Sequence, residues 1–110
     1  MKTNEVYLYH ILDAICQIES YTAEINRDVF EADDVRQDAV IRQIEIIGEA
    51  SRQLSDDFQD EHNHVPWSDT IGMRNRIAHD YMNIDLDIVW EVIHNDLPTL
   101  KSSVQRLLPE

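Results

Sequence analysis

The segment from Arg74 to Tyr81, with the sequence RNRIAHDY, brings together the side chains of this chain that are best suited to chemistry. His79 titrates near neutral pH and can act as a general acid or base on a ribose hydroxyl or a leaving oxygen. Arg74 offers a planar fork of donors to a phosphate and to the charge that develops on it in the transition state. Asn75 can orient the histidine or donate a hydrogen bond to the phosphate. These residue types suit cleavage of a phosphodiester without a metal ion.

The spacing of these residues favours a site built from two chains. On an ideal helix Arg74 and His79 differ in direction by about 140°, whereas Asn75 and His79 share a face. If the helix ends near His79 and the chain becomes extended, His79 and Tyr81 point to the same side. A dimer axis beside this helix would gather two copies of all four residues around one cleft. We therefore predict a composite site in a homodimer.

The same segment also has an interpretation without function. An arginine and a histidine five positions apart occur by chance in many helices. Arg76 and Asp80 could form an ordinary i,i+4 surface pair, and Tyr81 could be an ordinary half-buried aromatic residue. The spacing alone therefore does not decide between chemistry and structure.

Two long helices are predicted to precede this segment. Apolar residues recur every three or four positions over residues 4–25, and Asn4 is expected to cap this first helix. Residues 26–30 break the period and are expected to form a turn, with Phe30 packing back onto the core. Cys16 is expected to be a small buried hydrophobic residue of the first helix.

The second helix is predicted to start at Asp33 or Asp34 and to continue to about residue 55. Asp34 followed by Gln37 has the form of a capping box. Gly48 lies inside this helix, where a glycine costs roughly 1 kcal/mol relative to alanine, so we expect close approach of a neighbouring helix or of a second copy. The apolar positions of this helix are Val35, Ala39, Val40, Ile44, Ile46, Ile47, Ala50 and Leu54.

Shorter helices are predicted for the rest of the chain. Residues 56–66 are polar and aperiodic, and we expect a loop there. Ser68 is expected to cap a third helix that ends around residues 78–80. Asp85 is expected to cap a fourth helix, which Pro98 bends or restarts. The sequence therefore predicts an all-α protein, an antiparallel bundle of four to five helices.

Composition narrows the class of protein further. The chain has 110 residues, which fits one domain over residues 1–110, and its two glycines and three prolines favour a few long helices over a sheet. A single cysteine excludes an intrachain disulfide, so a reducing cytosol is the expected compartment, and we predict a cytoplasmic protein. No apolar run approaches the length of a membrane span, and we predict no association with membranes.

The charge balance limits the ways in which this chain could bind nucleic acid. Nine Lys and Arg residues stand against 22 Asp and Glu residues, a formal net charge of −13. The global field should repel nucleic acid, which argues against a broad coating role. An RNA enzyme of this composition would have to gather Arg74, Arg76 and also Arg42 or Arg52 at its cleft.

No metal site and no cofactor are predicted. His62 and His64 stand beside Glu61 in the predicted loop, but they lack the further ligands that a zinc site needs. Glu49 is undecided between a solvated helix charge and a residue that faces the cleft or pairs with an arginine.

At this point the sequence resembles the HepT-like toxins of the HEPN superfamily. Arg74, His79 and Tyr81 have the spacing of the family's Arg-x4-His-x-Tyr motif, and the resemblance extends over nearly the whole chain. The other matching segments, in order, are Ile46-Ile47-Gly48-Glu49-Ala50, Val65-Pro66-Trp67, Met73-Arg74-Asn75, Val89-Trp90 and Leu97-Pro98. The motif alone is a weak signal, whereas the combination in this order is a strong one.

The resemblance implies a fold, an activity and partners. HEPN proteins are helical bundles that dimerise and bring both motif copies into one cleft. Many are metal-independent ribonucleases, which implies catalytic roles for Arg74 and His79 and assistance from Asn75. Arg76 and Glu49 are further candidates for supporting roles. HepT-like members act on RNA, transfer RNA in particular.

The resemblance also implies regulation by a second protein. HepT-like toxins pair with a minimal nucleotidyltransferase antitoxin, which is MntA-like, in type VII-like toxin–antitoxin pairs. That partner adenylylates the motif tyrosine, here Tyr81. AMP on Tyr81 would place a negative phosphate and a bulky base beside His79 and would block RNA by charge and volume.

Other functions remain open on the sequence. One is a non-catalytic dimeric helical module that binds a nucleotidyltransferase and is modified by it. Another, a nucleotide-binding module, ranks last because the chain has no glycine-rich phosphate loop. A solvent-open cleft holding Arg74 and His79 from both subunits would support the enzyme, whereas burial of His79 against the core would oppose it.

Overall fold

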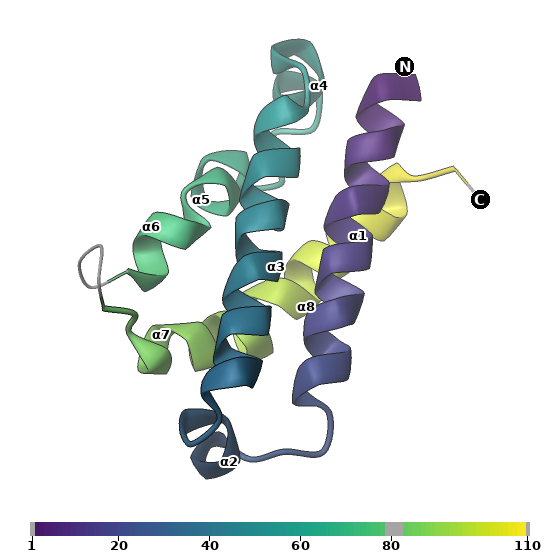
Figure 1. The fold of residues 1–110 in the computed structure, drawn as a ribbon. Helices are drawn as coiled ribbons and strands as arrows, with labels where there is room; N and C mark the ends of the chain where they lie inside the picture. Colours follow the sequence, from purple (N-terminus) through teal and green to yellow (C-terminus); the bar gives the residue numbers. More distant parts are fainter. Residues whose placement is uncertain (1, 79–82, 110) are drawn as a thin grey trace.

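Two long antiparallel helices, α1 (Lys2–Thr22) and α3 (Asp34–Gln53), lie side by side in the computed structural model and form the centre of the molecule (Figure 1). The structure describes residues 2–78 and 83–109. The remaining elements are α2 (Arg27–Glu31), α4 (Asp56–Glu61), α5 (Trp67–Ile71), α6 (Met73–Ile77), α7 (Leu86–Glu91), the π-helical turn η1 (Val92–Asp96) and α8 (Leu97–Leu107). The described residues contain no strand, and the predicted all-α bundle is confirmed. The homodimer stays a prediction.

The core forms where the apolar stripes of α1 and α3 face each other. Residues three, four and seven apart share one face of a helix, so most of each stripe is buried between the helices. Of the apolar positions predicted for the two helices, Leu12, Ile25, Ala39 and Ile46 are only partly buried. The segment α7–η1–α8 crosses behind this pair and closes the core (Figure 1). The largest fully buried side chains include Leu8, Ile11, Ile15, Ile18, Phe30, Ile44, Ile47, Ile77 and Leu97.

Details of α1 differ from the prediction. The helix is already formed at Lys2, so Asn4 is not its cap. The Asn4 side chain instead accepts a hydrogen bond of 3.0 Å from the backbone N–H of Ser55, and it ties α1 to the end of α3. Cys16 is exposed, because it lies on the face of α1 opposite the core, and its predicted burial is wrong. No helix within residues 2–78 or 83–109 is long and apolar enough to cross a membrane.

The connection from α1 to α3 holds a helix where a turn was expected. Asn26 caps α2 by accepting a hydrogen bond of 2.9 Å from the N–H of Val29. Phe30 is fully buried, as predicted, and its ring packs on Trp90 with 5.5 Å between centroids. This helix is too short for a period of apolar residues to reveal it in the sequence.

The start of α3 is capped one residue earlier than the predicted box. Asp33 accepts a hydrogen bond of 3.0 Å from the N–H of Arg36. Gln37 does not complete a box with Asp34 but donates to the carbonyls of Phe30 and Glu31. Val35, predicted to be an apolar contact, is 80% exposed.

The segment between α3 and α6 is more helical than predicted. Residues 56–66 were expected to be a loop, but Ser55 caps α4 by accepting from the N–H of Phe58. The third helix begins at Trp67 without a side-chain cap, so the predicted cap at Ser68 is wrong. Gly72 then divides this helix into α5 and α6.

The second half of the chain follows the prediction more closely. Asp85 caps α7 by accepting from the N–H groups of Asp87 and Ile88. Pro98 lies in the first turn of α8, after the π-helical turn, and so restarts the helix as expected. Ala78 is extended and forms an isolated antiparallel bridge with Ile84, in agreement with a helix end near residue 78.

Candidate functional site

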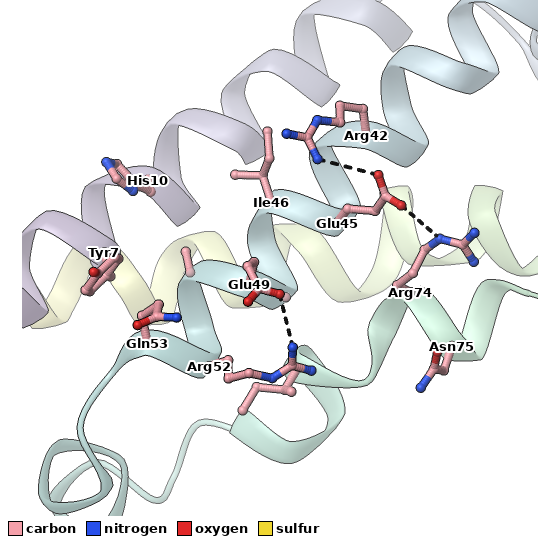
Figure 2. Close-up of a pocket in the computed structure, with 13 residues that line it drawn as sticks. Tyr7, His10, Arg42, Glu45, Ile46, Glu49, Arg52, Gln53, Arg74 and Asn75 are labelled. Carbon is pink, nitrogen blue, oxygen red and sulfur yellow. Dashed lines mark hydrogen bonds and ion pairs between the residues drawn. The ribbon is translucent and has the colours of Figure 1, made fainter.

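A groove of about 550 Å³ runs along the outer face of α3. Figure 2 shows α3 as its floor, with Tyr7 and His10 of α1 on one side and Arg74 and Asn75 of α6 on the other. Ile71 of α5 completes the second side. The groove therefore collects residues from four helices, among them three of the candidate site residues singled out from the sequence, Glu49, Arg74 and Asn75.

Four charged residues of α3 line the groove because of their spacing. Arg42, Glu45, Glu49 and Arg52 follow one another at intervals of three, four and three residues. Residues three and four apart are neighbours on a helix surface, so the four side chains form one row. The opposite face of α3 carries Val40, Ile44 and Ile47, which are fully buried.

Gly48 explains how α6 comes close to this row. A Cβ built at Gly48 would lie 3.1 Å from the backbone oxygen of Ile71, so a side chain there would press on the end of α5. The predicted close approach is thus confirmed, and the neighbour is α5 of the same chain. Because α6 follows α5 after one residue, this contact also places Arg74 beside α3.

The groove arginines are held by glutamates of α3. Arg74 Nε lies 3.4 Å from Glu45 Oε2, a long hydrogen bond, and Arg42 Nη1 lies 3.7 Å from Glu45 Oε1. Further along, Arg52 Nη1 donates to Glu49 Oε2 at 3.0 Å. Arg74 is partly covered, with 34% of its side chain exposed. Each arginine keeps donor atoms that these contacts do not use.

The local charge of the groove differs from that of the whole protein. Its lining holds three of the nine basic residues and two of the 22 acidic residues, in a chain of net charge −13. Guanidinium groups that retain free donors can bind phosphate oxygens in a planar, bidentate manner. The lining of the groove therefore suits an anionic chain better than the net charge of the protein indicates.

The residues singled out from the sequence fall into three groups. Arg74, Asn75 and Glu49 line the groove, and Glu49 pairs with an arginine, one of the two roles considered for it. Arg76 does not line it, because the side chain points to the other side of α6 and pairs with Asp96 of η1. His79 and Tyr81 lie outside the residues that the structure describes.

The described residues on both sides of the motif are tied together. Ala78 pairs with Ile84, and the backbone N–H of Asp85 donates to the carbonyl of Ile77 at 2.8 Å. The end of α6 and the start of α7 therefore lie close together. The position of Arg74 is fixed by α6, one turn before this junction.

Several groove residues were missed from the sequence. Glu45 gave no signal by itself, since its contact with Arg74 joins positions 29 residues apart. Its spacing of four from Glu49 could have indicated a shared face with that residue. Within residues 2–78 and 83–109, no three His, Cys, Asp or Glu side chains are grouped so that they could hold a metal ion.

Comparison with known families decides the class of protein. A family model described as HepT-like, ribonuclease HepT-like, matches residues 11–107. The chain belongs to this family. The match includes α3, α5 and α6, so the arginine row and Arg74 belong to the HepT-like part of the chain, as does the segment with His79 and Tyr81.

Named relatives agree with this assignment. The HepT-like chain is 38% identical over 106 residues to a protein of Thermococcus cleftensis named "Probable ribonuclease HepT", and the alignment covers 96% of each chain. It is 41% identical over 109 residues to a Methanocaldococcus jannaschii protein named "Gamma-glutamylcyclotransferase and putative RNase". That alignment covers 99% of this chain and 49% of the relative, so the chain spans about half of that protein. No solved structure was found to match the chain.

Proposed function

We propose that this protein is a metal-independent ribonuclease and the toxin of a type VII-like toxin–antitoxin pair. The observation that carries the proposal is the arginine groove: Arg74 and Asn75 open into it beside Arg42 and Arg52, in a chain of the ribonuclease HepT-like family. A single-stranded RNA could follow the groove with its phosphates on the arginines, which would overcome the unfavourable net charge locally.

The proposed reaction uses the ribose 2′-hydroxyl as nucleophile. His79 takes the hydroxyl proton while the 2′-oxygen attacks phosphorus, and the bond from phosphorus to the 5′-oxygen breaks. The departing 5′-oxygen takes a proton from solvent water, and the other fragment ends in a 2′,3′-cyclic phosphate. Arg74 stabilises the charge on the phosphate oxygens, and Asn75 donates to the phosphate or orients His79.

The proposal extends to assembly and regulation. A homodimer would bring two motif segments together in one cleft, and transfer RNA is the proposed substrate. A nucleotidyltransferase antitoxin would inactivate the enzyme by adenylylation of Tyr81. These points rest on the resemblance of the motif and on membership of the family.

The decisive test is cleavage of total transfer RNA in the presence of EDTA. We expect the wild-type protein to produce fragments on a denaturing gel, and the His79→Ala variant to produce none. His64→Ala serves as the matched control, since His64 is exposed and lies outside the groove. The control should cleave like the wild type.

The mass of the intact protein is needed to interpret a negative result. If the mass of the wild-type sample shows that Tyr81 is unmodified and this sample does not cleave RNA, the ribonuclease proposal fails. The non-catalytic module that binds a nucleotidyltransferase would then be the better interpretation. Cleavage by both the wild type and His79→Ala would instead point to a contaminating nuclease or to another catalytic residue.

A further inference from the structure

We infer that Glu45 is a positioning residue: it holds the guanidinium of Arg74 so that the two terminal nitrogens are left for the RNA phosphate. The inference deepens the proposed function and rests on it for its catalytic consequence. The contact itself does not rest on that proposal, because it is a feature of the described residues.

The atoms that make the contact support positioning. Glu45 Oε2 accepts from Arg74 Nε, the nitrogen nearest the side-chain stem, at 3.4 Å. Figure 2 shows the two terminal nitrogens of Arg74 pointing away from Glu45. A guanidinium presents five donors in a fixed plane, so fixing one edge also orients the others. A carboxylate that took both terminal nitrogens would instead compete with the phosphate.

Glu45 is itself held in place from its other side. Arg42, one turn earlier on α3, lies 3.7 Å from Oε1, the oxygen that Arg74 does not use. Within residues 2–78 and 83–109, Glu45 is the one carboxylate that contacts two arginines. One negative charge between two positive charges leaves the cluster positive. It can therefore still attract a phosphate.

The contact also joins two helices that must keep their relative position. Glu49 pairs with Arg52 of its own helix, whereas Glu45 reaches from α3 to α6. The side chain of Arg74 has several rotatable bonds, and ordering them when RNA binds costs free energy. A partner that orders Arg74 in the free protein reduces this cost, and a misplacement of about 1 Å can lower a rate roughly hundredfold.

The test compares Glu45→Ala with Glu45→Gln in RNA cleavage. Both variants remove the charge, but the glutamine keeps an oxygen that can accept from Arg74 Nε. We expect kcat to fall about tenfold in Glu45→Ala and to stay within about threefold of wild type in Glu45→Gln. KM should change less than kcat in both variants, because the loss of a negative charge from the groove favours RNA binding and offsets the added cost of ordering Arg74.

Glu31 provides the matched control. Its carboxylate also accepts from an arginine, Arg27, and its side chain is 42% exposed against 41% for Glu45. It lies on α2, outside the groove, so Glu31→Ala should cleave like the wild type. Equal losses of kcat in Glu45→Ala and Glu45→Gln would overturn the inference in favour of a role of charge alone. Wild-type kcat in Glu45→Ala would also overturn it.

A measurement that needs no activity separates this inference from the proposed function. The Nε–H group of Arg74 gives its own signal in a ¹H–¹⁵N NMR spectrum, which is assigned by its loss in Arg74→Lys. We expect faster hydrogen exchange at this group in Glu45→Ala than in wild type or Glu45→Gln. Unchanged exchange in Glu45→Ala would overturn the positioning role. If exchange responds as expected but the wild type does not cleave RNA, the proposed function fails and the contact stands.

Discussion

At the scale of single residues, the arginines differ in how many carboxylates they contact and therefore in how many of their N–H donors stay available. Arg76 is paired with Asp96 on the far side of α6, and Arg27 is held by both Glu31 and Asp87. Arg42 and Arg74 share one carboxylate between them. Exposed ion pairs contribute little to stability, usually below about 1 kcal/mol. The pairs in the groove are therefore better understood as arranging donors than as stabilising the fold.

Lys101 gives a prediction at this scale, because its pKa is raised above the ordinary 10.5. The main causes are a hydrogen bond to Glu19 and the attraction of the Glu19 charge, and the two side chains are 2.8 Å apart. A raised lysine pKa in the folded state adds stability below the unfolded pKa, and this stability is lost as the pH rises through the folded value. Lys101→Met should therefore melt below wild type at neutral pH.

The pH dependence of that difference is the measurement. Melting temperatures of both proteins should converge only as the pH rises through the pKa of Lys101 in the folded protein, which lies above the ordinary 10.5. A constant difference at all pH values would mean that the lysine stabilises by packing of its stem and not by its charge.

At the scale of elements, the close packing of α3 against α5 depends on Gly48. Alanine at this position would gain helix propensity but would bring Cβ to 3.1 Å from the Ile71 oxygen. Valine adds two further methyl groups at the same place. We expect Gly48→Val to lower the free energy of unfolding by about 1–3 kcal/mol, as overpacking does.

Chemical denaturation of the glycine, alanine and valine forms would test this expectation. Gly48→Val should be the least stable of the three, and Gly48→Ala should lie closer to wild type. RNA cleavage should fall with stability, because moving α5 also moves Arg74 away from Glu45. A valine form as stable as wild type would show that α5 can shift without cost.

The sequence predicted the long elements better than the short ones. The apolar period of α1 and α3 extends over many turns, whereas α2 and α4 have five and six residues, too few for a period to emerge. Asp33 and Asp34 are both good capping residues, and the sequence could not choose between them. The exposure of Cys16 depends on which side of α1 the other helices cover.

The same distinction applies to the site. Arg74 and Asn75 were found because their chemistry is visible in one short segment. Glu45 was not, because its contact with Arg74 exists only once α6 has been packed against α3. Arg42 and Arg52 could be named as candidates from the charge balance. Only the fold shows that Arg42 and Arg52 line the groove and that Arg76 does not, because Arg76 points away from it.

At the scale of the whole molecule, RNA must approach a protein of net charge −13. Binding should therefore depend strongly on salt and on the few arginines of the groove. Each phosphate contact with a single strand contributes about 0.7 to the slope of log K against log salt concentration. Removing Arg42 and Arg52 together should lower the magnitude of the slope by about 1.4 and weaken binding.

Fluorescence anisotropy with a labelled single-stranded RNA at several salt concentrations would measure this slope. His79→Ala can serve as the background, so that the RNA is not cleaved during the titration. Arg36→Ala is the control, since Arg36 lies on α3 but pairs with Asp33 outside the groove. Equal slopes for the double variant and this control would place the RNA elsewhere on the protein.

The backbone ties at Ala78–Ile84 and Ile77–Asp85 have a consequence for evolution. They hold the ends of α6 and α7 together through main-chain atoms, which any residue other than proline supplies as both donor and acceptor. Substitutions among residues 79–82 could then remove the role proposed for His79 without removing the ties that maintain the bundle. A lineage could in this way lose the proposed activity and keep a folded helical protein for another use.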